Sequence, residues 1–463
     1  RFDLRRHIRF DTRVTSVTYQ EETNLWRLQT DAGDELEARF CVMATGCLSV
    51  PNTPDFAGAD AFQGQVLHTG RWPKEPVDLS GKHVAIIGTG SSGVQAIPEL
   101  AREAAHLTVF QRTPVYTVPA NRKAMRAAVQ DEFRQNYRQI RDMQQANAGG
   151  VSGFRPLKST SRTERAADRT LSLPSAVPMA PEQGVPSILN LTEEERRHLV
   201  RERGLGVLLA FRDAYTNPEA NEAANAAFRD GIRDLVNDPG TAEILCPTTY
   251  GLGCKRQVLD RDYYDTFNRE NVTLVDVQAD PIEAITATGL RTRERAYEFD
   301  VLVYATGFDA MTGALLRANI TGRNGIRLSD KWADGPVMFL GLALSDCPNL
   351  FTVTGPGSPS VLCNMLVAIE QHVNWIGDCI GFMREHGHER IEALPEAESE
   401  WVAHVNAVAE GTMYTAPSCN SWYLGANIPG KPRIFMPYVG GYPKYRERCE
   451  HVAANGYEGF RLG

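Results

Sequence analysis

The 463-residue sequence lacks the cysteine patterns that mark redox and metal-binding proteins. Its nine cysteines, at positions 41, 47, 246, 254, 347, 363, 379, 419 and 449, include no C-x-x-C pair and no Cys/His cluster at zinc spacing. This argues against a dithiol redox enzyme and against a metal site. We expect most of these cysteines to be small buried hydrophobic residues.

Basic runs and long apolar runs are missing as well. A net charge of −8 without a Lys/Arg-rich run argues against a nucleic-acid-binding surface. No apolar segment approaches the length of a membrane span, and residues 1–9 lack the apolar core of a signal peptide. We therefore expect a cytoplasmic protein with neither nucleic acid nor membrane as a partner. Its 42% hydrophobic and 23% charged residues are typical of a globular chain of two or three domains.

A glycine-rich turn after a short apolar run is the most informative feature that is present. Residues 84–87 form a continuous apolar segment, which predicts a parallel strand buried on both faces. The turn follows at G-x-G-x-x-G spacing, where successive glycines allow a tight turn, a close backbone approach to a pyrophosphate, and helix–strand packing. We therefore predict a dinucleotide-binding unit. Its candidate cofactor-binding residues are Gly88, Thr89, Gly90, Ser91, Ser92, Gly93 and Gln95.

The end of the next predicted strand indicates which dinucleotide is bound. Residues 107–110 lead into Arg112 and Thr113, at the point where an NAD-binding unit usually carries an acidic residue for the ribose 2′-hydroxyl. A guanidinium, helped by a hydroxyl, suits a 2′-phosphate instead. The pattern favours NADP(H), and the alternative for Arg112 is a solvated charge at the end of a strand.

An alternating meander followed by a strand and the tripeptide A-T-G occurs twice. The first copy has strands at 13–19, 25–30 and 38–43 and ends in Gly46; the second ends in Gly307. The second copy closes the unit that the glycine turn opens, so the first should close a unit with a glycine turn of its own. No such turn precedes it, and we expect the chain to begin inside another dinucleotide domain.

A further motif, F-x-G-x-x-x-H-x-x-x-W, stands just ahead of the glycine turn and comprises Phe62, Gly64, His68 and Trp72. Taken singly, these residues are explained as core aromatics and a hydrogen-bonded structural histidine. Taken together, they resemble the fingerprint of the type I Baeyer–Villiger monooxygenases. The resemblance runs over almost the whole chain and is densest in the phenylacetone and cyclic-ketone branch. Relatives that oxygenate nitrogen or sulfur usually carry another aromatic residue in place of Trp72.

The resemblance implies an NADPH-dependent flavin monooxygenase that contains FAD and takes dioxygen and a small-molecule ketone. In that family a C4a-peroxyflavin attacks the ketone, and the product is an ester or a lactone. We expect a monomer or a weak homo-oligomer. Two alternatives stay open: a flavin monooxygenase that oxidises nitrogen or sulfur, and a non-catalytic NADP-binding module.

The resemblance also assigns roles to residues whose spacing alone does not decide them. Lys255 and Arg256 follow a glycine-rich loop and could form a solvated pair; the family pattern makes Arg256 catalytic and Lys255 an NADP ligand. An exposed Trp422 should belong to a lid over the cofactor. The other candidates are, for the flavin side, Val14, Thr45, Gly46 and Met365, and, for the substrate pocket, Cys47, Leu48, Ser360, Val361, Leu362 and Cys363. His68 and Trp72 are expected at the hinge between domains.

These inferences predict an α/β protein with two dinucleotide-binding, Rossmann-like domains and a helical insertion. Within the insertion, residues 124–143 should be helical, 147–184 should form a long loop, and Thr192 with Glu195 should begin a helix as a capping box. The expected segments are a partial FAD-binding domain (1–50), the first part of the NADP-binding domain (51–123), the insertion (124–245), the second part of the NADP-binding domain (246–310), and a return to the FAD-binding domain (311–463).

Overall fold

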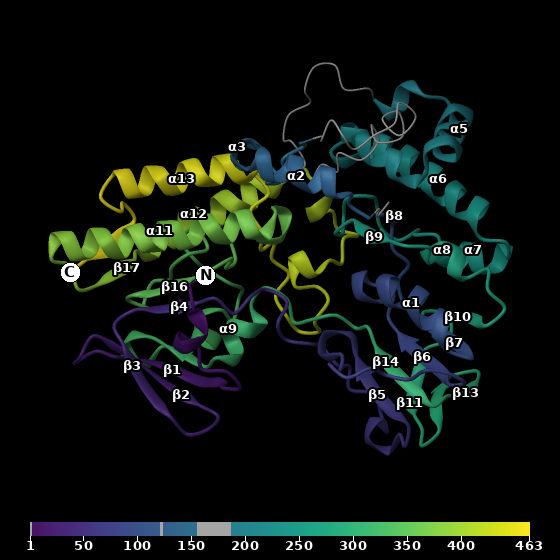
Figure 1. The fold of residues 1–463 in the computed structure, drawn as a ribbon, viewed down its shortest axis with the longest axis horizontal. Helices are drawn as coiled ribbons and strands as arrows, with labels where there is room; N and C mark the ends of the chain where they lie inside the picture. Colours follow the sequence, from purple (N-terminus) through teal and green to yellow (C-terminus); the bar gives the residue numbers. More distant parts are fainter. Residues whose placement is uncertain (1, 121–123, 155–186) are drawn as a thin grey trace.

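The computed structural model describes residues 2–120, 124–154 and 187–463, so most of the predicted long loop at 147–184 lies outside the described residues. The chain forms a mixed α/β structure with two lobes (Figure 1). One lobe combines the first strands of the chain with its last long helices. The other lobe contains the glycine turn, and further helices cover it.

A five-stranded parallel sheet forms the centre of the second lobe. Its strand order is β10-β7-β6-β14-β5. The strands are β10 (Val272–Asp276), β7 (His106–Gln111), β6 (His83–Ile87), β14 (Val301–Tyr304) and β5 (Gln65–His68). Strand β6 lies in the middle, and its residues 84–87 are at most 6% exposed. The predicted buried strand is therefore confirmed, and helix α1 (Ser91–Glu103) follows it directly.

The first meander forms a separate sheet in the other lobe. Strands β1 (Val14–Gln20), β2 (Leu25–Thr30) and β3 (Glu35–Ala38) are antiparallel, and β15 (Ile320–Thr321) pairs parallel with β1. The predicted strands at 13–19 and 25–30 are confirmed. The predicted strand at 38–43 is wrong as a single element. The chain changes sheets there: Ala38 ends β3, whereas β4 (Cys41–Met43) pairs parallel with β16 (Leu350–Thr352).

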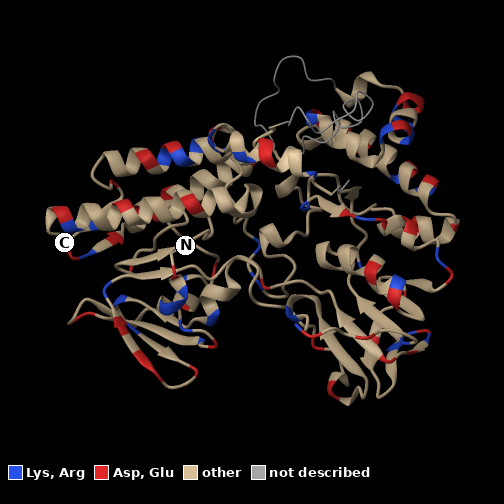
Figure 2. Cartoon of the chain, viewed as in Figure 1, with Lys and Arg blue, Asp and Glu red and all other residues tan. Residues whose placement is uncertain are grey.

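Helices of the first lobe lie over the pair formed by β4 and β16 (Figure 1). They are α11 (Met365–His386), α12 (Pro395–Ala409) and α13 (Tyr442–Ala454). Acidic and basic side chains are interspersed along α13 (Figure 2). Within the described residues, no helix combines the length and the apolar character needed to cross a membrane.

The helices of the predicted insertion contact both lobes. The expected helix at 124–143 is interrupted at Asn136, which separates α2 (Ala127–Gln135) from α3 (Tyr137–Ala146). Helix α3 packs against α13 in the first lobe. Helix α5 (Glu193–Arg203) begins with the predicted capping box, in which the backbone N–H of Glu195 donates to the Thr192 hydroxyl at 3.2 Å.

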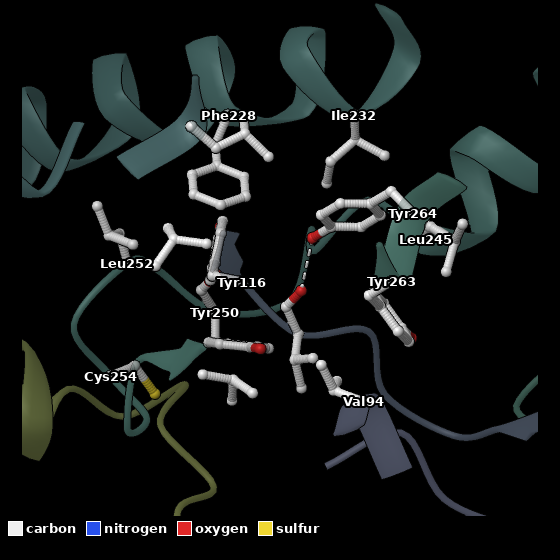
Figure 3. Packing of buried hydrophobic residues seen from close by; sticks show 14 of the residues in the cluster. Val94, Tyr116, Phe228, Ile232, Leu245, Tyr250, Leu252, Cys254, Tyr263 and Tyr264 are labelled. Atoms are coloured by element: carbon white, nitrogen blue, oxygen red, sulfur yellow. Dashed lines mark hydrogen bonds between the residues drawn. The ribbon is translucent and has the colours of Figure 1, made fainter. Parts of the chain in front are cut away.

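Aromatic packing joins the rest of the insertion to the second lobe (Figure 3). Phe228 of α6 (Pro218–Leu235) meets Tyr116 edge-on, with ring centroids 5.0 Å apart, and Tyr116 meets Tyr250 in the same way at 5.4 Å. Tyr264 of α8 (Tyr263–Thr266) donates a hydrogen bond to the Val115 carbonyl at 3.0 Å. This cluster holds the segment before Lys255 and Arg256 against the end of β7.

Candidate functional site: a glycine turn, three cations and a cavity

The glycine turn has the geometry that its sequence predicts. Gly88 has a φ of 109°, in the left-handed region that favours glycine. A Cβ on Gly93 would collide with the carbonyl oxygen of Gly88, so this glycine is needed for the packing of α1 on the turn. A Cβ on Gly90 would meet nothing within 4 Å, and its φ of −73° suits any residue. Gly90 is therefore not required by the fold, and its bare backbone is free to face a ligand.

One side chain of the turn stabilises the fold, and others face a cavity where a ligand could bind. The Thr89 hydroxyl donates to the carbonyl of Thr113 at 3.1 Å and is buried, so it ties the turn to the end of β7. Ser91 and Gln95 are exposed and line a cavity next to the turn. Ser92 is half-buried in the first turn of α1. The start of α1 therefore presents backbone N–H groups and short polar side chains to an anion.

Two cations without counter-ions lie beside the end of β7. Arg112 is exposed there, and the Lys255 ammonium lies 4.2 Å from the ring centroid of Tyr250, whose hydroxyl donates to the Pro114 carbonyl at 2.8 Å. Neither cation forms an ion pair within the described part of the chain. Burial, and next the charge of Arg112, lower the pKa of Lys255 to about 8. Two uncompensated cations at this place fit a phosphate dianion.

The lowered pKa of Lys255 predicts a pH dependence for NADPH. Because the ammonium loses its proton as the pH rises through about 8, the attraction for the 2′-phosphate should be present below this pH and lost above it. We expect kcat/KM for flavin reduction by NADPH, measured anaerobically, to fall roughly tenfold between pH 7 and pH 9.5. NADH, which lacks the 2′-phosphate, should show no such fall, and Lys255→Met should flatten the NADPH profile. A fall of equal size in Lys255→Met would contradict this assignment.

Arg256 lines a cavity of about 410 Å³ next to the glycine turn. Its Nη1 donates to the carbonyl of Val361 at 2.7 Å, which fixes the guanidinium at the start of the segment 360–363. Tyr423 packs beside it: burial raises the pKa of this phenol to about 12, and the Arg256 charge opposes the rise. Lys255, Val361, Leu362 and Cys363 also line the cavity, so the structure places these candidates together.

Three other candidates for the substrate pocket lie outside the cavity lining. The Cys47 carbonyl accepts a hydrogen bond from the Met311 N–H at 2.8 Å, and burial raises the pKa of the Cys47 thiol. The Ser360 hydroxyl contacts the Met311 sulfur at 3.9 Å, and Leu48 is 42% exposed. A hydrogen bond with Ser360 and the charge of Arg256 both oppose this rise in the pKa of Cys47, so the thiol lies near these two residues. These residues flank the cavity on the side of β4.

The flavin-side candidates come from three elements of the first lobe. Thr45 and Gly46 follow β4, and Gly46 has a φ of 74°. Met365 opens α11, whose N-terminus is capped by the Asn364 side chain. Residues 360–362 form a 3-10 helix before this cap, so α11 itself begins only at Met365. Val14 begins β1 opposite Thr30, in the separate meander sheet.

The fingerprint residues lie on β5 and on either side of it in the chain. His68 ends β5; its Nδ1 accepts from the Gly70 N–H at 2.9 Å and its Nε2 lies 3.3 Å from the Asn52 carbonyl oxygen. Burial lowers the pKa of His68, which favours the neutral ring that this bonding needs. A Cβ on Gly64 would collide with the Asp300 carbonyl and the Phe62 ring, and Trp72 is 39% exposed. The hinge role expected of His68 and Trp72 stays a prediction.

The segment with Trp422 is anchored rather than free. The prediction of an exposed Trp422 is wrong, because this ring is half-buried, 4.4 Å from the ring of Tyr423. Further along, the Lys431 ammonium donates to the Asp309 carboxylate at 2.7 Å and to the Ala310 carbonyl at 2.8 Å. Residues 421–433, which we call the lid segment, are therefore fastened to the connection after β14.

Breaking the Lys431–Asp309 contact should loosen the lid segment. Lys431 is only 13% exposed in its side chain, so Lys431→Met removes two charge-assisted hydrogen bonds from a partly dry site. We expect backbone amide exchange in residues 421–433 to become roughly tenfold faster. Lys444→Met, at an exposed position on α13, is the matched control and should leave that exchange unchanged. Equal protection in the two variants would show that the ion pair does not hold the segment.

Sequence reasoning missed several residues of the cavity. Tyr215, Tyr414 and Tyr423 line it from three segments far apart in the chain. It also missed a disulfide between Cys254 and Cys419, while the other seven cysteines are free and buried, as expected for small hydrophobic residues. Spacing within one sequence carries no signal for contacts at such separations.

Comparison with known proteins gives four concordant matches. Residues 2–163 match the family model described as pyridine nucleotide-disulphide oxidoreductase. A Baeyer–Villiger monooxygenase of Pseudooceanicola batsensis is 38% identical over 98% of this chain and 78% of its own length. An oxidised steroid monooxygenase bound to NADP is 44% identical, with a TM-score of 0.84, over 100% of this chain and 82% of that one. The enzyme OTEMO in complex with FAD and NADP is 36% identical, with a TM-score of 0.87, over the same shares.

Proposed function

Since this chain belongs to the Baeyer–Villiger monooxygenase family, we propose that the cavity beside Arg256 is the place where a ketone and dioxygen become an ester or a lactone. The protein is an FAD- and NADPH-dependent monooxygenase. The observation that carries the placement is the common cavity lined by Arg256, Lys255 and residues 361–363, next to the glycine turn.

The residues around the glycine turn fit NADP(H). Arg112 and Lys255 carry two charges without an ion-pair partner in the described chain, next to the Thr113 backbone that Thr89 fixes. The 2′-phosphate would lie between these cations, and the pyrophosphate against Gly90, where the backbone is uncovered. Ser91 and Gln95 would then face the part of the cofactor that enters the cavity.

The part of the site formed by β4, the residues after it and the start of α11 would hold a large, mostly apolar ring system. Three apolar side chains on β4, after it and on α11 are exposed: Val42 by 43%, Leu48 by 42% and Leu366 by 74%. Apolar side chains of this kind suit contact with a planar group such as the isoalloxazine of FAD. Thr45, Gly46 and Met365 lie near these side chains in the sequence and would hold the ring by backbone contacts.

Arg256 would stabilise negative charge that develops during the reaction. The bound, reduced flavin activates dioxygen and supplies the oxygen atom that is inserted next to the ketone carbon. The guanidinium would stabilise the negative charge that develops on the carbonyl oxygen of the ketone. Its hydrogen bond to the Val361 carbonyl orients the group before the substrate arrives, so little reorganisation accompanies the reaction.

The lid segment would keep water away from this chemistry. Tyr423 lines the cavity and is 1% exposed, and the Trp422 ring packs against it. Exclusion of water strengthens the interaction of Arg256 with developing charge and suppresses the release of hydrogen peroxide. His68 and Trp72 would govern how the two cofactors approach each other and would carry no proton.

The purified holoenzyme tests this function. It should be yellow, oxidise NADPH faster when a cyclic ketone is added, and release the corresponding lactone, identified by mass spectrometry. A protein without flavin absorbance would support the non-catalytic NADP-binding module. Oxidation of amines or sulfides without any lactone would support the nitrogen- or sulfur-oxidising alternative.

A further inference from the structure

A disulfide joins two loops that each carry a residue of the proposed site. Cys254 and Cys419 are bonded to each other, with Cα atoms 5.4 Å apart and a separation of 165 positions in the chain. Cys254 lies two positions before Arg256, and Cys419 lies three positions before Trp422. In Figure 3 the sulfur of Cys254 points toward a ribbon in the olive colour of the late part of the chain.

Both half-cystines are buried among the residues of the cavity wall. Each is 0% exposed, and both belong to the large apolar cluster that also contains Tyr423 and Leu424. Each also ends a tight turn: the Cys254 N–H donates to the Gly251 carbonyl at 3.2 Å, and the Cys419 N–H donates to the Ala416 carbonyl at 2.8 Å. A movement of either loop is therefore passed directly to the other.

Few non-covalent contacts join the two loops. The Arg256 guanidinium donates to the Val361 carbonyl at 2.7 Å and contacts the Tyr423 hydroxyl. The Cys419 carbonyl accepts from the Arg433 guanidinium at 2.7 Å. Besides the S–S bond, the Cys419 sulfur lies 2.8 Å from the Cys254 carbonyl oxygen. The covalent bond is thus the strongest restraint between the loop of Arg256 and the loop of Cys419, which leads into the lid segment.

We propose that Cys254 and Cys419 are positioning residues for oxygenation, whose disulfide fixes the loop of Arg256 relative to the loop of Trp422. The inference rests on the roles proposed above for Arg256 and Trp422. Reduction adds two electrons and two protons to the S–S bond and leaves two thiols; a dithiol reagent supplies both and becomes a cyclic disulfide. With the bond broken, the site loses alignment and lets in water, so more of the NADPH consumed ends as hydrogen peroxide.

Thiol counting is the first test. Alkylation of the denatured holoenzyme should modify seven of the nine cysteines of this sequence, because seven are free, and all nine after reduction. Peptide mapping should recover Cys254 linked to Cys419. Nine alkylated cysteines before any reduction would overturn the inference.

The second test measures how much ester is formed for each NADPH oxidised. The reductant is removed before this assay. Reduction should lower this ratio by about tenfold, because a displacement of roughly 1 Å in a catalytic geometry can cost up to about 10²-fold in rate. The rate of flavin reduction by NADPH should stay unchanged, which a general loss of structure would not allow. Reoxidation should restore the ratio.

Two variants separate the disulfide from other effects. Cys254→Ala/Cys419→Ala should behave like the reduced enzyme and should not respond to reductant. Cys246→Ala, at a buried free cysteine of the same cluster, should keep the full response of the ester yield to reductant. If the double variant does not fold, the comparison of the oxidised and the reduced wild-type enzyme tests the inference. Equal ester yields per NADPH in those two states overturn this inference alone, whereas no ester in either state overturns the proposed function as well.

Discussion

Replacing Arg256 by alanine is expected to abolish ester formation while NADPH is still consumed. Its guanidinium lines the cavity and is oriented by the Val361 carbonyl at 2.7 Å. Removal of a single donor that stabilises developing negative charge typically costs about 10²–10³ in rate. Flavin reduction depends on the NADP-binding residues and should persist, so the electrons should appear as hydrogen peroxide. Product analysis by gas chromatography, together with a peroxide assay, measures both fates.

The control for this experiment is another arginine of the same segment. Arg261 lies five positions further on and is exposed outside the cavity lining. Arg261→Ala removes the same charge from the chain and should retain ester formation. If Arg256→Ala also forms ester at the wild-type rate, the guanidinium has no part in the reaction.

Replacing Gly90 by alanine should weaken NADPH binding without disturbing the fold. Its φ of −73° and the open space around its hypothetical Cβ make alanine acceptable to the protein itself. The added methyl group would, however, occupy the place where the pyrophosphate approaches the backbone. Loss of one charge-assisted hydrogen bond costs about 1.5–3 kcal/mol, so we expect the Kd for NADPH to rise by at least roughly tenfold. Titration calorimetry measures this, and the melting temperature should be unchanged.

Gly93 provides the matched comparison, because it serves packing and not the ligand. Its Cβ would collide with the Gly88 carbonyl, so Gly93→Ala should lower the melting temperature whether or not NADPH is present. Gly90→Ala with unaltered NADPH affinity would show that the cofactor does not approach this backbone.

Features that depend on neighbours in the sequence could be predicted well. The strand at residues 84–87, its glycine turn and the capping box at Thr192 arise from interactions within a few positions, and all are present in the structure. The ends of helices are harder to predict from the sequence. Helix α11 begins at Met365 because Asn364 caps it, and the pattern of apolar residues does not reveal that cap.

Features that depend on distant contacts could not be predicted. The chain leaves one sheet after Ala38 to pair with β16 in another, although its apolar pattern continues without a break. Trp422 appears exposed in a Gly/Pro-rich segment but is half-buried against Tyr423. The partner of Cys254 likewise lies 165 positions away. Such pairings are decided by the packed chain and not by local periodicity.

The most direct measurement is turnover of the purified holoenzyme with NADPH and a cyclic ketone under ¹⁸O₂. If the cavity beside Arg256 performs the insertion proposed here, the lactone should carry one atom of ¹⁸O in its ring. A lactone without the isotope, or NADPH consumption that yields only hydrogen peroxide for every ketone tested, would contradict the account.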